Sequence, residues 1–239
     1  MASWVTHLII ADRILARFPA LDRRGFCVGN IAPDCNLENA DFTDFIPSRE
    51  TTHWMSVKND KLTADCEGFY QAYIEERKGA ISSNEEYAFL IGYYAHLISD
   101  VEFQRMLIDP ARIDTAWRRA LAIPALAEKA RGLTPCWPAV KRLIPKEERM
   151  KDVYAIEAEY LAAHSDSGYL TDILPLRSFP DYIDYLPEGA IVRKIGVMWY
   201  LPKAEESAFP FVAVSREEYA AYIDAAAARV SDRISPNLR

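Results

Sequence analysis

Apolar residues recur at helical spacing from the start of the chain. Ser3 can serve as an N-cap, and Trp4 and Leu8 lie on one face of the helix that would follow it. Pro19 ends this pattern, because proline cannot continue a helix. The sequence therefore predicts a first helix over residues 3–18.

The same spacing predicts further helices along most of the chain. Ser83 with Glu86, and Ser215 with Glu218, have the sequence pattern of a capping box. Between residues 87 and 107 apolar side chains surround the predicted helix on nearly every side, which is typical of a central, buried helix. The predicted helical regions are 21–31, 60–78, 83–107, short helices between the prolines that follow Pro110, 147–164 and 215–234.

Two segments lack this spacing. Residues 35–59 show no sustained helical or strand period, so we expect a long ordered loop there. Asp34 would lie at the start of this loop, just after the end of the second helix. Residues 168–214 are rich in tyrosine and proline, and their stretches AIVRKIGVMWYL and PFVAV are β-branched and aromatic. This second segment predicts a few short strands or an extended cap.

The predicted fold class is therefore mainly α, a helical bundle with an irregular or short-strand C-terminal addition. We expect residues 1–239 to form a single domain. Its parts would be a helical core (1–165), a cap or insertion (166–214) and a C-terminal helix (215–234).

Composition and charge narrow the range of functions. The 239 residues are 50% hydrophobic, enough for one substantial core, and 35 acidic against 28 basic side chains give a net charge of −7. Because the charges are spread along the chain and no basic surface is indicated, we expect no stable binding to nucleic acid.

Cysteine usage and the N-terminal segment point to the cytoplasm. The four cysteines include no Cys-x-x-Cys pair and are too few for a disulfide framework. The N-terminal apolar run has no basic leader and is broken by Asp12 and Arg13, so we expect neither a signal peptide nor a membrane span. The oligomeric state cannot be predicted from these features.

One histidine and one aspartate stand out in the central helix, within GYYAHLISD. His96 and Asp100 are four residues apart, so their side chains lie on the same face of a buried helix. A buried carboxylate requires a cation, a metal or several hydrogen-bond donors. An arginine could pair with Asp100 while His96 bonds to a tyrosine, and a metal could bind both.

Other segments supply matching residue types. His7 lies in the first helix, His53 in TTHW in a region with aromatic residues, and Asp34 in NIAPDC at a helix end. Neutral imidazoles and carboxylates are ligands for zinc, and also for iron or manganese. The sequence therefore predicts a metal site formed by His7, Asp34, His53, His96 and Asp100.

Four motifs in this order, SWVTHLIIADRIL, GNIAPD, TTHW and FLIGYYAHLISD, resemble those of the bacterial zinc-dependent phospholipase C family, which is more distantly similar to fungal single-strand-specific nucleases. The resemblance covers roughly residues 3–107. It implies a helical bundle of that type, holding up to three zinc ions that activate water to attack a phosphoester.

The resemblance also implies individual roles for the five residues. Asp34, His53, His96 and Asp100 would hold one metal, and His7 would hold a second metal that Asp100 bridges. Asp34 would in addition be the catalytic residue that assists the attacking water as a general base. We therefore expect one or two zinc ions.

The sequence departs from the family pattern at two ligand positions and at the N-terminus. Gln104 stands where the family commonly has another histidine, and a later histidine–glutamate pair is not recognisable, although Glu157, Glu159 and His164 could replace it. Secreted members expose a terminal tryptophan whose amine binds metal, whereas MAS precedes Trp4, which would act as a core residue, an aromatic wall or a carbonyl ligand.

A metal-activated water at such a site would hydrolyse an ester at neutral pH. The substrate would be a small-molecule or lipid-like phosphoester, with aromatic walls from Phe42, Phe45 and Trp54. Two alternatives remain open at this point. One is a metal-stabilised helical binding protein without turnover, in which protein ligands fill the site. The other is a non-haem iron enzyme.

Overall fold

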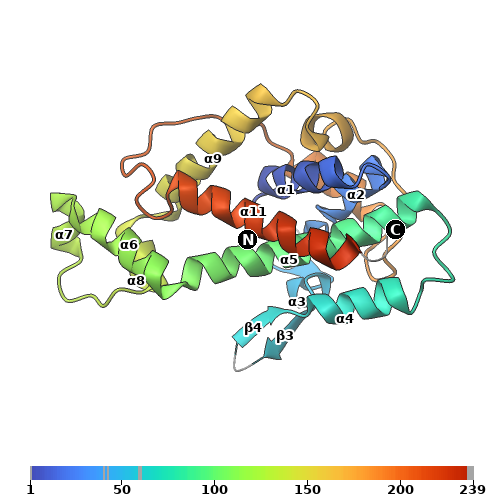
Figure 1. The fold of residues 1–239 in the computed structure, drawn as a ribbon, viewed down its shortest axis with the longest axis horizontal. Coiled ribbons are helices and arrows are strands. Elements are labelled where there is room, and N and C mark those ends of the chain that lie inside the picture. The colour runs from blue at the N-terminus through green and yellow to red at the C-terminus, as the bar shows by residue number, and fades with distance from the viewer. Residues whose placement is uncertain (1, 40, 42, 59–60, 236–239) are drawn as a thin grey trace.

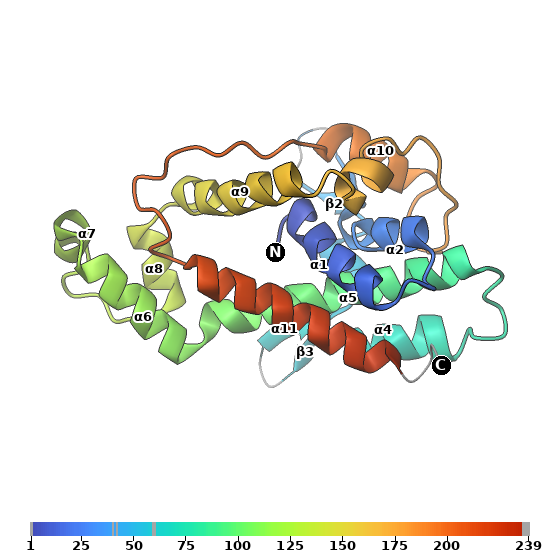
Figure 2. The same ribbon diagram turned by 45° about the horizontal axis from the view of Figure 1, so that its top comes forward.

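The long helix α5 (Asn84–Ile108) lies at the centre of the structure, a computed structural model that describes residues 2–39, 41, 43–58 and 61–235. Helices α1 (Trp4–Arg17), α2 (Arg23–Gly29) and α11 (Arg216–Ile234) pack around α5, as Figures 1 and 2 both show. Residues 88–99 of α5 are all buried, so the prediction of a central buried helix is confirmed.

The remaining elements are short apart from α9, and they surround this centre. The structure also has a 3-10 turn at Ala32–Asp34 and two π-helical turns, at Gln71–Glu75, directly after α4, and at Tyr169–Ile173. The other helices are α3 (Arg49–Thr52), α4 (Cys66–Tyr70), α6 (Pro110–Leu121), α7 (Pro124–Lys129), α8 (Trp137–Leu143), α9 (Lys146–Ala163) and α10 (Ala190–Met198).

Two antiparallel hairpins complete the fold. Strand β1 (Leu37–Glu38) pairs with β2 (Phe45–Ile46), and β3 (Met55–Lys58) pairs with β4 (Lys61–Ala64), with Met55 opposite Ala64. The fold is therefore mainly helical, as predicted. Among the described residues, no helix combines the length and apolar character that crossing a bilayer requires.

Side-chain caps explain where the predicted helices begin. Ser3 accepts the backbone N–H of Thr6 at the start of α1, and the capping box of Ser215 with Glu218 forms completely at the start of α11. At α5 only half of the predicted box forms. Ser83 accepts the N–H of Glu86, whose own carboxylate accepts from Ser82 instead.

Three local predictions were wrong. Residues 35–59 form two short strands, α3 and β3 rather than one loop, and the helix predicted over 60–78 begins only at Cys66, because Lys61–Ala64 pairs with β3. Asp65 caps this later start. In residues 168–214, all of them described, AIVRKIGVM forms helix α10 and no strand forms, so the strand alternative was wrong, whereas the cap stays a prediction.

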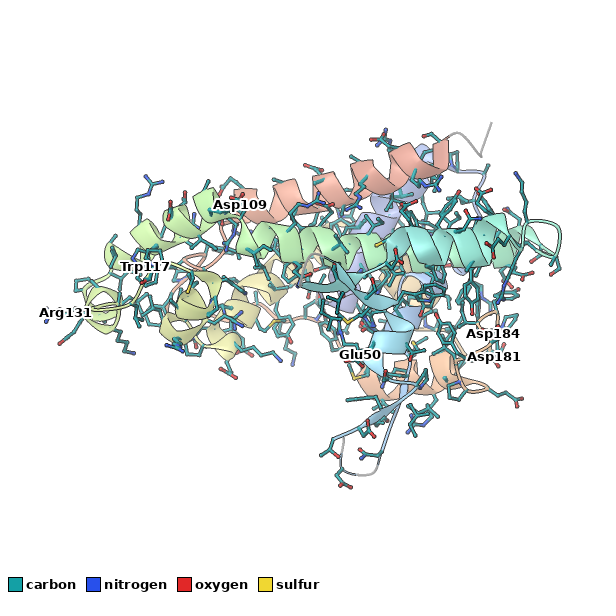
Figure 3. All side chains as sticks on the ribbon, turned by 90° about the horizontal axis from the view of Figure 1, so that it is seen from below. Glu50, Asp109, Trp117, Arg131, Asp181 and Asp184 are labelled. Carbon is teal, nitrogen blue, oxygen red and sulfur yellow. The ribbon has the colours of Figure 1, made fainter. Side chains whose placement is uncertain are left out.

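The C-terminal end of α5 leads into α6, α7 and α8, which lie at the end of the structure away from the C-terminus (Figure 1). These helices have a small apolar cluster of their own, separate from the large cluster around α1, α5 and α11. Trp117 and Arg131 mark this end in Figure 3, opposite Asp181 and Asp184. The proposed division of the chain into core, cap and C-terminal helix stays a prediction.

Two glycines set the distance between α2 and α5. A Cβ atom added to Gly92 would lie 2.2 Å from the carbonyl oxygen of Phe26, and one added to Gly29 would lie 2.1 Å from that of Phe89. Both gaps are shorter than any real contact between carbon and oxygen. The backbones of α2 and α5 can therefore touch only because these positions lack side chains.

We predict that Gly92→Ala destabilises the protein, by about 2–4 kcal/mol, because the helices must separate. Thermal and urea unfolding would measure the loss. Gly196→Ala is the matched control, since a methyl group at Gly196 of α10 would meet nothing within 4 Å. That variant should be stabilised by roughly 0.5–1 kcal/mol. Equal effects of the two changes would contradict the close-packing explanation.

Candidate metal centre

The structure brings the five predicted ligand residues together at one place beside α5. His7 comes from α1, Asp34 ends the 3-10 turn after α2, and His53 is the C-cap of α3. His96 and Asp100 lie one turn apart on α5. Figure 3 labels Glu50, which marks α3 below α5 in that view.

His96 is held with a defined tautomer. Its Nδ1 lies 2.8 Å from the carbonyl oxygen of Asn30, which can only accept, so Nδ1 carries the proton. The lone pair of Nε2 therefore points away from Asn30, and it lies 3.4 Å from Nε2 of His53. A ring nitrogen fixed in this way by a backbone carbonyl is typical of metal-ligating histidines.

Among the residues that the structure describes, neither ring nitrogen of His7 has a hydrogen-bond partner, although its side chain is completely buried. Its ring stacks on His96 with centroids 3.9 Å apart, and its Nε2 lies 3.7 Å from Oδ1 of Asp100. A buried polar atom without a partner costs about 1–3 kcal/mol. A cation bound between His7 and Asp100 would provide the missing partner, so these residues fit a metal.

The two oxygens of Asp100 face two different histidines. Oδ1 lies 3.7 Å from His7, while Oδ2 lies 3.8 Å from Nε2 of His53. Possible ligand atoms also form two compact groups, each within 4.8 Å: His7, His96 and Asp100, and Asp34, His53 and His96. The two groups share His96, whereas Asp100 belongs only to the first. The bridging role that the resemblance implies for Asp100 is therefore supported by the contacts of its two oxygens and not by these groups.

Burial and neighbouring groups set the protonation states. Burial lowers the pKa of His96 to about 3, so that its ring is neutral. Burial alone would raise the pKa values of Asp34 and Asp100, but contacts with His53 and His7, respectively, keep both well below their usual range. Neutral imidazoles and charged carboxylates are the forms that bind metals.

Two further side chains contact the carboxylates, and the sequence analysis did not assign them these contacts. The indole Nε1 of Trp4 donates to Oδ2 of Asp34 over 3.1 Å, and Nη2 of Arg49 donates to Oδ2 of Asp100 over 3.1 Å. Helical spacing places Trp4 three residues before His7, on the same face of the predicted first helix, but it does not give the partner of the indole. Arg49 lies in a segment that was predicted as a loop, so its contact could not be inferred from the spacing.

The residues suggested as replacements for missing family ligands do not join the cluster. Glu157 accepts from Ser3, Thr6 and Tyr200 in the interior. Glu159 pairs with Arg216 at the surface. His164 is exposed and stacks on Tyr160. These suggestions were wrong because residues 157–164 run along α9, where other partners bind them.

Two cavities open beside the candidate ligands. One of about 310 Å³ reaches Asp100, and the other, of about 430 Å³, reaches Asp34. His53 and Arg49 line both cavities, so they lie where the two meet. Of the aromatic residues predicted as walls, Phe45 lines the second cavity, Trp54 lines neither, and Phe42 lies outside the described residues.

Fold and site together define the class: a mainly helical protein with a candidate metal centre of three histidines and two aspartates. Residues 6–102 match the family model described as zinc-dependent phospholipase C, which confirms the resemblance. The match covers α1 to most of α5 and includes all five candidate ligands. No curated protein and no solved structure shows a significant match to the chain.

We predict that protein purified without added metal contains at least one equivalent of zinc, and that His96→Ala removes it. The variant loses a nitrogen that both ligand groups share. Elemental mass spectrometry would measure the metal content. His164→Ala is the control and should keep the wild-type content. Retention of zinc by the His96 variant would place the metal elsewhere.

We predict that the metal-free protein loses stability as the pH falls from about 6.5 towards 3. The unfolded chain binds a proton at His96 near pH 6.5, whereas the folded protein does so only near pH 3, so acid favours unfolding. The loss is up to about 1.4 kcal/mol per pH unit. Urea unfolding at several pH values should show a shallower dependence for His96→Gln, but not for His164→Gln.

Proposed function

We propose that this protein is a zinc-dependent hydrolase of phosphoesters, with His7, Asp34, His53, His96 and Asp100 holding one or two ions. The observation that carries this proposal is the placement of Asp100, whose two oxygens face two histidines from different helices. The family match supports the choice of zinc and of a phosphoester. Iron and manganese accept the same ligand types.

Bound zinc would supply a water of lowered pKa as a nucleophile near neutral pH. The protein residues would fix the geometry around it. Asn30 orients His96, and Trp4 holds one oxygen of Asp34 while the other lies 3.3 Å from His53. Side chains held in this way need little reorganisation during the reaction.

Asp34 is a candidate ligand and, by resemblance, a candidate general base. Its position suits both roles, since it lines the second cavity. Its lowered pKa favours the role of ligand, because a carboxylate that binds protons weakly is a weak base. We therefore propose metal binding as the first role of Asp34 and assistance to the attacking water as the second.

The cavities fit a substrate with a charged head and an apolar part. Phe45, Met198 and Tyr200 give the second cavity apolar walls, and Lys194 adds a cation that pairs with Glu38. Lys194 and Met198 come from α10, so the segment proposed as a cap contributes to this wall. We propose a small-molecule or lipid-like phosphoester as the substrate.

The main rival is a closed metal centre that only stabilises the fold. Complete burial of His7 and His96 favours this view. However, His53, Asp34 and Asp100 line cavities, and a catalytic site is one that keeps a position open for water or substrate. The open side of the centre therefore favours hydrolysis.

We predict that the zinc-loaded protein hydrolyses bis(p-nitrophenyl) phosphate, p-nitrophenyl phosphate or short-chain phosphatidylcholine. Chelation should abolish the activity, and His53→Ala should lower kcat/KM at least about 100-fold, because a ligand that faces both cavities is lost. Release of nitrophenol or phosphocholine would be followed. Comparing the diester, monoester and lipid identifies the substrate class.

Two controls make this experiment decisive. His164→Ala should keep the full rate, since that exposed residue lies on α9 outside the cluster. Hydrolysis that persists after zinc is removed would point to a contaminant. Zinc-loaded protein that cleaves none of the three substrates would favour the stabilising role instead.

A further inference from the structure

Arg49 occupies an unusual position at the candidate metal centre. It is the first residue of α3, and its carbonyl oxygen accepts the N–H of His53 over 2.8 Å, so its backbone is fixed relative to a candidate ligand. Its guanidinium donates through Nη2 to Asp100 over 3.1 Å. The side chain is nevertheless 37% exposed, so much of it faces open space.

That open space is the approach to the centre. Arg49 lines the cavity that reaches Asp100 and also the cavity that reaches Asp34. A substrate that enters through either cavity therefore meets this guanidinium next to the ligands. Arg49 and His53 alone, among the described residues, line both cavities.

The other cations that line these cavities are less suited to meet a phosphoryl group at the ligands. Lys194 bonds to Glu38 over 2.8 Å, and both side chains are only 4% exposed, so the charges of this pair offset each other. Lys141 is exposed on α8 and lines only the cavity that reaches Asp100. Arg49 is thus the cation in contact with a candidate ligand.

The chemistry of arginine fits this place. A guanidinium stays charged at all relevant pH values and carries five N–H donors in a planar fork that matches phosphate oxygens. In the described part of the chain, the guanidinium of Arg49 donates a hydrogen bond only to Asp100. Several donors therefore remain for a ligand.

We propose that Arg49 is a catalytic residue that binds the phosphoryl oxygens of the substrate through the donors not used by Asp100. This inference rests on the proposed function and deepens it. Gln104 lies one turn after Asp100 on α5, is exposed and lines the cavity that reaches Asp100. Its amide is a poorer zinc ligand than the histidine that the resemblance implies there. The positive charge of Arg49 offsets part of the phosphoryl charge that an additional metal would otherwise stabilise.

Binding of inorganic phosphate to the zinc-loaded protein tests this proposal without turnover. Calorimetry would compare wild type with Arg49→Ala, Arg49→Lys and Lys141→Ala, and elemental analysis would confirm the zinc content of each. We expect phosphate binding to weaken at least about tenfold in Arg49→Ala with zinc retained, because a charged hydrogen bond is lost. Lys141→Ala removes one positive charge from the same cavity and should change binding little.

Kinetics with the best substrate of the panel give a second readout. Arg49→Ala should lower kcat/KM by about 10²–10³-fold, the usual effect of removing a donor to developing negative charge. Arg49→Lys should recover part of this loss, since it keeps the charge but not the fork. Lys141→Ala should stay close to wild type.

The outcomes separate this inference from the proposed function. Unchanged phosphate binding in Arg49→Ala, or an equal loss in Lys141→Ala, overturns the role of Arg49. Zinc loss in Arg49→Ala also overturns it, because Arg49 would then only hold Asp100 in place. If wild-type protein binds phosphate through Arg49 but hydrolyses none of the substrates, the role of Arg49 in phosphate binding stands and the proposed hydrolase function is refuted.

Discussion

The direct contact between the backbones of α2 and α5 is the constraint on which the candidate centre depends. Gly29 and Gly92 allow these helices to touch, and the residue after Gly29 is Asn30, whose carbonyl fixes the ring of His96. The 3-10 turn that ends at Asp34 follows shortly after Asn30. If the helices stood one side chain further apart, Asn30 could not reach His96, and Asp34 would leave the cluster.

The second requirement is to keep charged groups in an apolar interior. Asp34 and Asp100 lie among buried helices, where an unpaired carboxylate would be very costly. Donors at fixed positions reduce that cost: the indole of Trp4 for Asp34, and Arg49 and the backbone N–H of Ala2 for Asp100. His7 is the exception: within the described residues, its buried ring nitrogens have no hydrogen-bond partner.

The sequence predicted the long elements and the ligand residues, but not the contacts between them. His96 and Asp100 could be placed on one face because helical spacing is regular. The strand at Lys61–Ala64 was missed because its conformation is set by pairing with β3 and not by its own residues. Helix α10 was missed because its β-branched residues suggested strands, although Ile191 and Ile195 are four residues apart. Contacts by Trp4 and Arg49 depend on tertiary packing.

Helix α10 lines the second cavity but lies far along the chain from the candidate ligands, and this affects how the cavity can change. All five candidate ligands lie between residues 7 and 100, whereas Lys194, Met198 and Tyr200 of the second cavity come from a segment almost a hundred residues further along the chain. Part of the wall of this cavity is thus encoded in a stretch of the chain that contains none of the candidate ligands. Mutations, insertions or exchanges in the later stretch can reshape this wall while the candidate ligands stay intact, so related chains could keep the same ligands and differ in what the cavity accepts.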